Sequence, residues 1–308
     1  DRSSESKSED NPVETTILEI LPAFTPIPTS TPILPPLQSA ISGDRYYFYG
    51  DWESAILSYE ETLGSADTPE EGSAALLGLG KVYFQKGDYQ KTLDYLRLLV
   101  ASYPESDLIH KAYFVLAETF TTLDRHLEAA DAYNLYLGRR PGIVDNYIQH
   151  KRGDALSTAG ESIKAIEAYQ AAIAAGSGAD LYTLQLKIGQ EYAAMEDYNT
   201  AIVIYNDVYL QSNNDNTKAR ADYLLGLAYT EIGQNDLAEE AFRDAVLQYP
   251  LSYDSYLGLI EIVNNDALIA KDHCLLNPAF GDSSLEVGGA DADFIIDGCM
   301  VDIKTTKS

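Results

Sequence analysis

Residues 80–92 read GKVYFQKGDYQKT, and a segment of the same pattern occurs five more times along the chain. Each copy begins with a small residue, and successive copies are 37, 37, 36, 36 and 37 positions apart (Gly43, Gly80, Ala117, Gly153, Gly189, Gly226). Three positions later stands a large residue (Tyr46, Tyr83, Phe120, Leu156, Tyr192, Tyr229). Twelve positions after the first small residue stands a second one, and four beyond it another large one (Tyr59, Leu96, Tyr133, Tyr169, Tyr205, Phe242). The chain is therefore an array of repeated units.

Each unit predicts two antiparallel helices. The small residues let the helices approach closely, and the large residues fill the space beside them. A Gly-Asp turn such as 50–51 or 87–88 separates the two helices, and Pro104, Pro141 or Pro250 ends three of the units. This pattern resembles the tetratricopeptide repeat, whose period is about 34 residues. The resemblance implies an all-α fold, a right-handed superhelix of about six helix–turn–helix repeats.

The repeats set the expected domain limits. We expect a solenoid over residues 38–265, with repeats starting near 38, 73, 110, 146, 182 and 219 and a final helix over 252–264. Residues 1–37 are first polar and then rich in Pro and Thr, with 6 of the 12 prolines in 22–36, which favours an extended segment. Residues 266–308 depart from the repeat, and the alternation in DFIID and MVDIK predicts a β-hairpin around a Gly-Cys turn.

The charge of the chain excludes one class of partner. With 48 acidic and 21 basic side chains, the net charge is −27. Nucleic-acid binders need a basic surface to neutralise phosphates, so we expect none here. We also expect no cofactor and, because no apolar run reaches about 18 residues, no membrane span. Of the 23 tyrosines, eight fill the large-residue positions of the repeats.

The N-terminal segment has two interpretations. It is a tether to an upstream anchor or signal that was removed before Asp1, or a docking strip for a groove. Apolar residues favour docking, because a linker made only for reach is polar or Gly/Ser-rich (Ile17, Leu18, Phe24, Ile27, Ile33, Leu34).

The resemblance to the repeat family also suggests a groove. In that family the positions three and six before the first small residue face inward along the first helix of each repeat. Here these positions are mixed aromatic and basic, with one lysine added just after Gly80 (Lys81, Lys111, Phe114, Tyr147, His150, Arg220, Tyr223). Such a set suits an extended peptide that carries a carboxylate or apolar anchors.

Three further runs carry a more particular resemblance: residues 139–161 (RRPGIVDNYIQHKRGDALSTAGE), 202–234 and 244–263. With the Pro-rich tether, residues 22–263 resemble the repeat region of lytic murein transglycosylases of Chloroflexota-type bacteria. That family's catalytic Glu lies on a later domain that has no counterpart here. The resemblance implies an extracytoplasmic, cell-envelope location and an ancillary role near peptidoglycan.

The C-terminal stretch 277–307 weakly resembles the start of a PD-(D/E)xK nuclease core. Asp293 and Asp302 are the candidate Mg²⁺ ligands, and Lys304 would orient the attacking water. The rest of such a core does not follow, so the alternative is a plain terminal hairpin.

Three functions follow from these observations. The first is a non-catalytic scaffold that binds protein or peptide segments in the cell envelope and self-associates, with head-to-tail filaments as one form. The second is the substrate-positioning part of a peptidoglycan lytic enzyme, and the third is a Mg²⁺-dependent nuclease. No complete catalytic domain is visible, so the expected answer is the scaffold.

Overall fold

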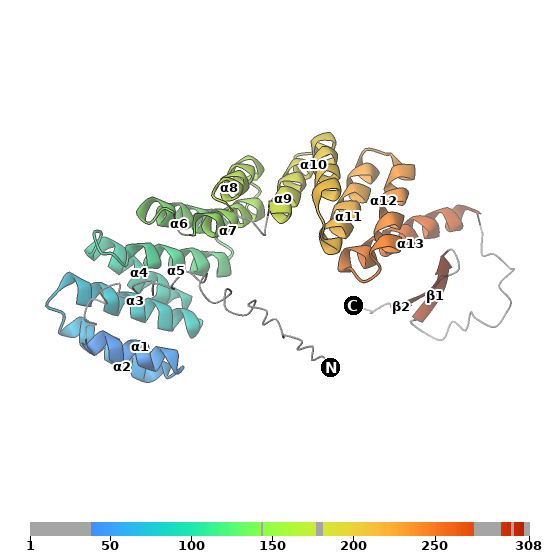
Figure 1. The fold of residues 1–308 in the computed structure, drawn as a ribbon. Helices are drawn as coiled ribbons and strands as arrows, with labels where there is room; N and C mark the ends of the chain where they lie inside the picture. The colour runs from blue at the N-terminus through green and yellow to red at the C-terminus, as the bar shows by residue number, and fades with distance from the viewer. Residues whose placement is uncertain (1–37, 143, 177–180, 274–290, 297–298, 305–308) are drawn as a thin grey trace, which may run out of the picture.

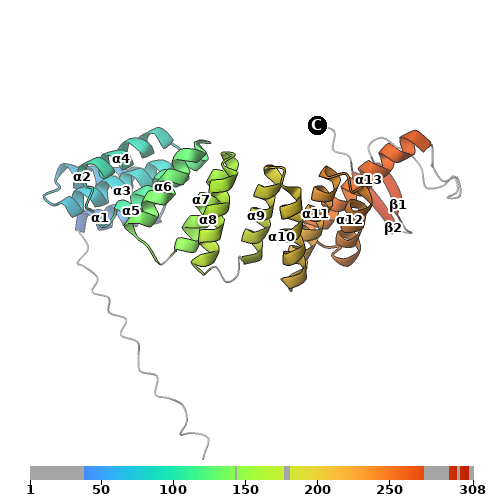
Figure 2. The same ribbon diagram turned by 90° about the horizontal axis from the view of Figure 1, so that it is seen from above.

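A computed structural model describes residues 38–142, 144–176, 181–273, 291–296 and 299–304, without the side chains of 38–41, 265–273 and the two strands. The described residues form thirteen helices and one antiparallel hairpin. Consecutive helices pair, and the pairs stack side by side into an elongated, curved array (Figures 1 and 2). The predicted all-α solenoid of about six helix–turn–helix repeats with a terminal hairpin is confirmed.

The odd-numbered helices are the first of each pair: α1 (Gln38–Phe48), α3 (Pro69–Gln85), α5 (Ile109–Thr122), α7 (Asp145–Thr158), α9 (Leu181–Ala194) and α11 (Asp215–Glu231). The even-numbered helices are the second: α2 (Trp52–Gly64), α4 (Tyr89–Ser102), α6 (His126–Arg139), α8 (Ser162–Ala174), α10 (Tyr198–Gln211) and α12 (Asn235–Gln248). A single helix, α13 (Tyr253–His273), packs on α11 and α12. Strands β1 (Asp291–Ile296) and β2 (Cys299–Lys304) form the hairpin.

The turn between the two helices of a repeat is the same in all six pairs. Seven residues after the first small residue, the backbone takes a positive φ between 56° and 77° (Gly50, Gly87, Asp124, Gly160, Glu196, Gly233). Glycine adopts this conformation at no steric cost, which explains its use at four of the six turns. Asp124 and Glu196 hold it with a side chain, which costs free energy.

The core repeats one contact from pair to pair. Gly153 of α7 lies against the ring of Tyr169 in α8, and a methyl group at Gly153 would overlap that ring. The corresponding large residues of the other pairs are equally buried, at most 1% exposed (Tyr59, Leu96, Tyr133, Tyr205, Phe242). The small residue thus sets the distance between the two helices, and the large one fills the gap.

Two details of the C-terminal prediction were wrong. We expected the last helix to end at residue 264, but α13 continues to His273. Residues 265–273 contain no Gly or Pro to stop it, and the repeat pattern had already ended there. The expected Gly-Cys turn is also one residue off, because Cys299 pairs with Ile296 within the hairpin.

Candidate functional site

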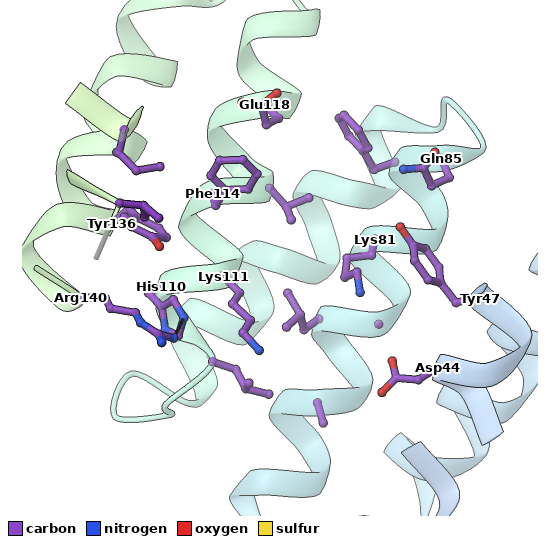
Figure 3. Close-up of a pocket in the computed structure, with 18 of the residues that line it drawn as sticks. Asp44, Tyr47, Lys81, Gln85, His110, Lys111, Phe114, Glu118, Tyr136 and Arg140 are labelled. Carbon is purple, nitrogen blue, oxygen red and sulfur yellow. Dashed lines mark hydrogen bonds between the residues drawn. The ribbon is translucent and has the colours of Figure 1, made fainter. Parts of the chain in front are cut away.

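A large cavity lies in the groove formed by the odd-numbered helices of the first four repeats (Figure 3). It has a volume of about 680 Å³ and walls from α1, α3, α5 and α7, closed at one side by the end of α6. Its floor is apolar and aromatic, and its rim is charged (Leu77, Phe114, Val115, Tyr136, Ile148; Asp44, Lys81, His110, Lys111, Glu118, Arg140). We call it the α1–α7 pocket.

Four of the seven predicted groove residues line this pocket. Lys81 comes from α3, Lys111 and Phe114 from α5, and Tyr147 from α7. In Figure 3, Lys81 and Lys111 project into the same space, with Tyr136 and Arg140 on the opposite side of α5. The pocket therefore brings together residues that the sequence placed on three separate helices.

The other three predicted residues lie elsewhere. His150 packs edge-on against Tyr169, with its Nε2 3.5 Å from Asp154. Tyr223 packs against Phe242, with ring centroids 5.9 Å apart. Phe114 makes the same kind of contact with Tyr133, so the position three before the small residue mainly packs within its own repeat. The side chains of His150 and Tyr223 therefore take part in the packing within their own repeats.

Arg220 forms an ion pair with Asp254 of α13 at 3.0 Å. It lines a smaller cavity of about 360 Å³ between α9, α11 and α13. Arg220 therefore lies in a different cavity from Lys111, although the groove prediction had placed both residues in one set.

The carboxylates of the α1–α7 pocket already have partners. The hydroxyl of Tyr59 donates to Asp44 at 2.6 Å, and the hydroxyl of Tyr133 donates to Glu118. Lys151 of α7 completes the second group, with its Nζ 3.1 Å from Glu118. These acids are thus held by the protein itself.

The cations of the pocket are not held in this way. Among the described residues, no carboxylate lies within 4.0 Å of Lys81, Lys111 or Arg140. The Nζ of Lys81 lies 4.4 Å from the centroid of the Tyr47 ring, and Arg140 donates to Nε2 of His110 at 2.8 Å. Three cations therefore surround an apolar cavity in a protein that is strongly acidic overall.

His110 completes this end of the pocket. Its burial, and secondarily the charge of Arg140, lower the pKa of its imidazole. The imidazole therefore stays neutral in the free protein at neutral pH, which leaves Nε2 unprotonated to accept the hydrogen bond from Arg140.

Sequence reasoning missed several lining residues. Asp44 and Glu118 occupy the same repeat position as Lys81, one residue after the small residue, so the rule that selected Lys81 applies equally to them. His110 and Arg140 stand at positions that the repeat pattern leaves variable, and no signal in the sequence joins them.

The predicted metal and docking residues fall largely outside the described part of the chain. Asp293 and Asp302 are directly opposite in the hairpin register, and Lys304 is opposite Asp291, but their side chains are not described. The docking candidates Ile17, Leu18, Phe24, Ile27, Ile33 and Leu34 lie in residues 1–37, outside the described residues. In the described part, no group of three or more His, Cys, Asp or Glu side chains is placed to hold a metal ion.

The hydropathy of the helices gives one further result. Among the helices in the described ranges, none has both the length and the apolar character that a bilayer crossing requires.

Comparison with known proteins gives the repeats a name. Tetratricopeptide-repeat models match residues 42–107 and 220–252. No curated protein matches the chain. The resemblances to murein transglycosylases and to a nuclease core find no support.

Solved structures with a similar arrangement include MamA and BtubC. A crystal structure of MamA is 24% identical over 66% of this chain and 92% of its own, with a TM-score of 0.40. BtubC from P. vanneervenii is 16% identical over 68% of this chain and 88% of its own, with a TM-score of 0.45. The family matches and the helix pairs described above together show that the fold is a tetratricopeptide-repeat solenoid.

Proposed function

We propose that this protein is an interaction scaffold that binds an extended peptide segment of a partner in the α1–α7 pocket. The observation that carries the proposal is the set of three cations without a carboxylate partner, Lys81, Lys111 and Arg140, around an apolar floor. Lys111 and Arg140 are exposed and Lys81 is half-buried, so all three charges are accessible to an anionic ligand. The scaffold needs no chemistry of its own.

The pocket chemistry defines the ligand. Lysine and arginine offer charge-assisted hydrogen bonds to a carboxylate, and the aromatic rings of Phe114 and Tyr136 suit a large apolar side chain next to it. The ligand is therefore an extended segment in which an acidic residue stands close to Leu, Ile or Phe. Stacked repeats present an extended concave surface, which suits a segment of this extended kind.

The chain itself contains such a segment. Residues 14–24, ETTILEILPAF, combine two glutamates with the predicted docking residues Ile17, Leu18 and Phe24. We propose that the N-terminal segment of one copy occupies the pocket of another, which would join copies head to tail into a filament. Deleting residues 1–37 should then give monomers by light scattering, and assembly that persists after the deletion would disprove this form of the proposal.

A synthetic peptide of residues 14–24, with both ends blocked, tests the pocket directly. Isothermal titration should show binding to the protein lacking residues 1–37. The double substitution Lys111→Ala with Arg140→Ala should weaken that binding at least about tenfold, since a hydrogen bond to a charged group contributes about 1.5–3 kcal/mol.

A matched control removes a cation outside the pocket. Lys164 on α8 pairs with Glu161 and is exposed, so Lys164→Ala should leave the affinity unchanged. Equal losses for the pocket and control variants would mean that only the overall charge matters. The absence of any binding to the unsubstituted protein would count against the pocket as a peptide site.

We also propose an extracytoplasmic location in the cell envelope, close to peptidoglycan. The Pro- and Thr-rich stretch 22–36 before the solenoid supports it, because such a stretch serves well as a semi-rigid spacer from an envelope anchor. Protease treatment of intact cells should then degrade the protein while a cytoplasmic marker survives. Protection of both would argue against this location.

A further inference from the structure

His110 occupies an unusual place at the edge of the α1–α7 pocket. It stands in the first turn of α5 and is only 8% exposed. Arg140 approaches its Nε2 at 2.8 Å, and the ring of Tyr136 packs against it edge-on at 5.7 Å. Arginine can only donate, so Nε2 must be the acceptor, and only an unprotonated nitrogen can accept. The free pocket is therefore built around a neutral imidazole.

The groups around His110 are mostly cationic. Arg140 and Tyr136 face it from the end of α6, and Lys111 follows it on α5. The other walls of the pocket contribute Lys81 from α3 and Tyr147 from α7. Burial has the largest effect in lowering the pKa of His110, followed by the charge of Arg140 and, to a smaller extent, that of Lys111.

One acidic residue acts in the opposite sense. Asp107, in the loop before α5, raises the pKa of His110 because its backbone carbonyl accepts a hydrogen bond from the imidazole and because its side chain is negatively charged, without cancelling the lowering. No described carboxylate lies within 4.0 Å of the ring of His110. A protonated His110 in the free protein would therefore point its Nε2 hydrogen at another cation and find no acceptor.

A ligand carboxylate would remove this conflict. It offers two oxygens, one for the remaining N–H groups of Arg140 and one for Nε2 of a protonated His110. The neutral hydrogen bond between Arg140 and His110 would be exchanged for two charge-assisted hydrogen bonds to the anion.

We propose that His110 is a binding residue of the pocket that takes up one proton when an acidic ligand binds, so that Arg140 and the imidazolium hold the ligand carboxylate together. This inference rests on the proposed function of the pocket and adds a residue and a proton to it. Nothing in the repeat pattern singles out His110.

The sign of the pH dependence follows from proton linkage. The complex binds one more proton at His110 than the free protein does, so a lower pH favours the complex. Affinity should rise about tenfold for each unit by which the ligand raises the pKa of His110. Ligand glutamates stay ionised above about pH 5.5, so the effect of His110 is visible between pH 7.5 and 5.5.

The direct test follows His110 by NMR in the protein lacking residues 1–37. The ring signals of the four histidines are assigned by substitution, and the titration midpoint of His110 is measured with and without the blocked peptide of residues 14–24. We expect a midpoint below the usual histidine range in the free protein and a clear rise when the peptide saturates. A peptide with Glu14→Gln and Glu19→Gln should not produce the rise.

The possible results separate the two proposals. Saturable peptide binding without any change in the midpoint of His110 would overturn the inference alone. No binding at any pH would overturn the proposed function and the inference with it.

Affinity measurements give a second, independent check. His110→Gln keeps an acceptor for Arg140 but cannot take up a proton in this range. We expect the roughly tenfold gain in its peptide affinity between pH 7.5 and 5.5 to disappear, whatever its affinity at pH 7.5. His126→Gln, outside the pocket, should keep the full gain. A His110→Gln variant that retains the pH dependence would refute the role of His110.

Discussion

The groove of the odd-numbered helices has two halves that use their cations differently. From α7 onward, Lys151 pairs with Glu118, Lys187 pairs with Asp154 at 2.7 Å, and Arg220 pairs with Asp254. Each of these pairs joins one repeat to the next. In the first three repeats, Lys81 and Lys111 have no such acidic partner. In the described part of the groove, cations brace neighbouring repeats in the second half, whereas Lys81 and Lys111 in the first half pair with no carboxylate; the pair of Lys86 with Glu53 lies outside the α1–α7 pocket.

A single repeat position explains the difference. Lys151 and Lys187 both stand two residues before the small residue of their helix, and each reaches the acid of the preceding repeat. In α3 and α5 this position holds Gly78 and Val115, and both line the α1–α7 pocket. The pocket thus exists where two side chains that would fill the groove are short. The same scaffold gives a brace or a binding site, depending on one residue per repeat.

The largest expected effect concerns Asp222, a buried acidic residue of the second half that does not take part in the ion pairs named above. Asp222 of α11 is 5% exposed, its Oδ2 has no hydrogen-bond partner among the described residues, and burial, with a further contribution from Asp244, raises its pKa to about 7. The unfolded value is 3.8, so the native state binds the proton more tightly. The stabilisation is therefore present below about pH 4 and is lost as the pH rises through 7.

Asp222→Asn removes this loss at high pH. A shift of this size corresponds to about 4 kcal/mol, so the variant should be more stable by up to about that amount at pH 9 and close to unchanged at pH 4. Urea unfolding followed by circular dichroism at both pH values measures it. An equal gain at pH 4 and pH 9 would show that the charge of Asp222 is not the cause.

The next prediction concerns a variant that gives the first half of the groove an ion pair like those of the second half. Val115→Glu should place a carboxylate opposite Lys81, in the geometry that joins Lys151 to Glu118, with the signs reversed. The peptide of residues 14–24 should then bind about a hundredfold more weakly, since one cation is neutralised and a like charge is added. Titration calorimetry measures the loss. Val115→Leu, which adds bulk without charge, should cost less, and full affinity in the Glu variant would contradict the comparison.

A smaller difference is expected in stability. Lys187→Met removes a brace between two repeats and should lower the free energy of unfolding by about 1 kcal/mol, the usual scale for a partly exposed ion pair. Lys111→Met removes a cation without a carboxylate partner and should change it by less than about half of that. Thermal unfolding of the two variants side by side distinguishes them. Equal losses would mean that the braces do not contribute to stability.

The smallest effect concerns the turns, which are alike in both halves. Glu196 holds a φ of 63°, a conformation that other repeats give to glycine. Glu196→Gly should stabilise the protein by about 0.5–1 kcal/mol, because the strain of the left-handed backbone outweighs the entropy that glycine loses. Gly160→Ala, at the equivalent turn, should do the reverse. Chemical denaturation of both variants checks the pair, and a loss in Glu196→Gly would mean that its side chain has another role.

The sequence predicted the fold well because the fold is a repeat. The spacing of Gly43, Gly80 and their counterparts predicts six helix pairs, and the large residue on the second helix of each pair is buried where the pattern places it. Where the repetition ends, the prediction weakens, and the end of α13 was therefore placed too early. Residues 265–273 contain no Gly or Pro that would end the helix, so the length of α13 could not be predicted from the sequence.

The candidate site was predicted in part, and the reason is physical. Lys81, Lys111, Phe114 and Tyr147 were found because groove positions recur with the repeat. His150 and Tyr223 were assigned to the groove by the same rule, although their rings pack on Tyr169 and Phe242. A side chain at such a position can point into the groove or toward the second helix of its repeat, and the packing around it decides which.

The contact between His110 and Arg140 was not predictable from the sequence. The two residues are 30 positions apart and share no repeat position with other charged pairs. Their contact depends on how the end of α6 meets the start of α5. The pocket itself forms because the side chains at positions 78 and 115 are short. Short side chains at two positions form no sequence pattern from which a pocket could be predicted.

The groups of tyrosine, acid and lysine have a mechanical consequence. Asp154 accepts from Tyr169 within its own repeat and from Lys187 of the next, so one carboxylate ties the closure of a helix pair to its neighbour. Among the described residues, Asp44 accepts from Tyr59 alone, and no lysine of α3 pairs with it. Under tension along its axis, the solenoid should resist most where these ties join α5 to α7 and α7 to α9, and less between the first two repeats, where the ion pair in the described part is the exposed one of Lys86 with Glu53. The pocket spans the first three boundaries between repeats, so tension along the axis should first widen it between α1 and α3, away from the pair of Lys151 with Glu118.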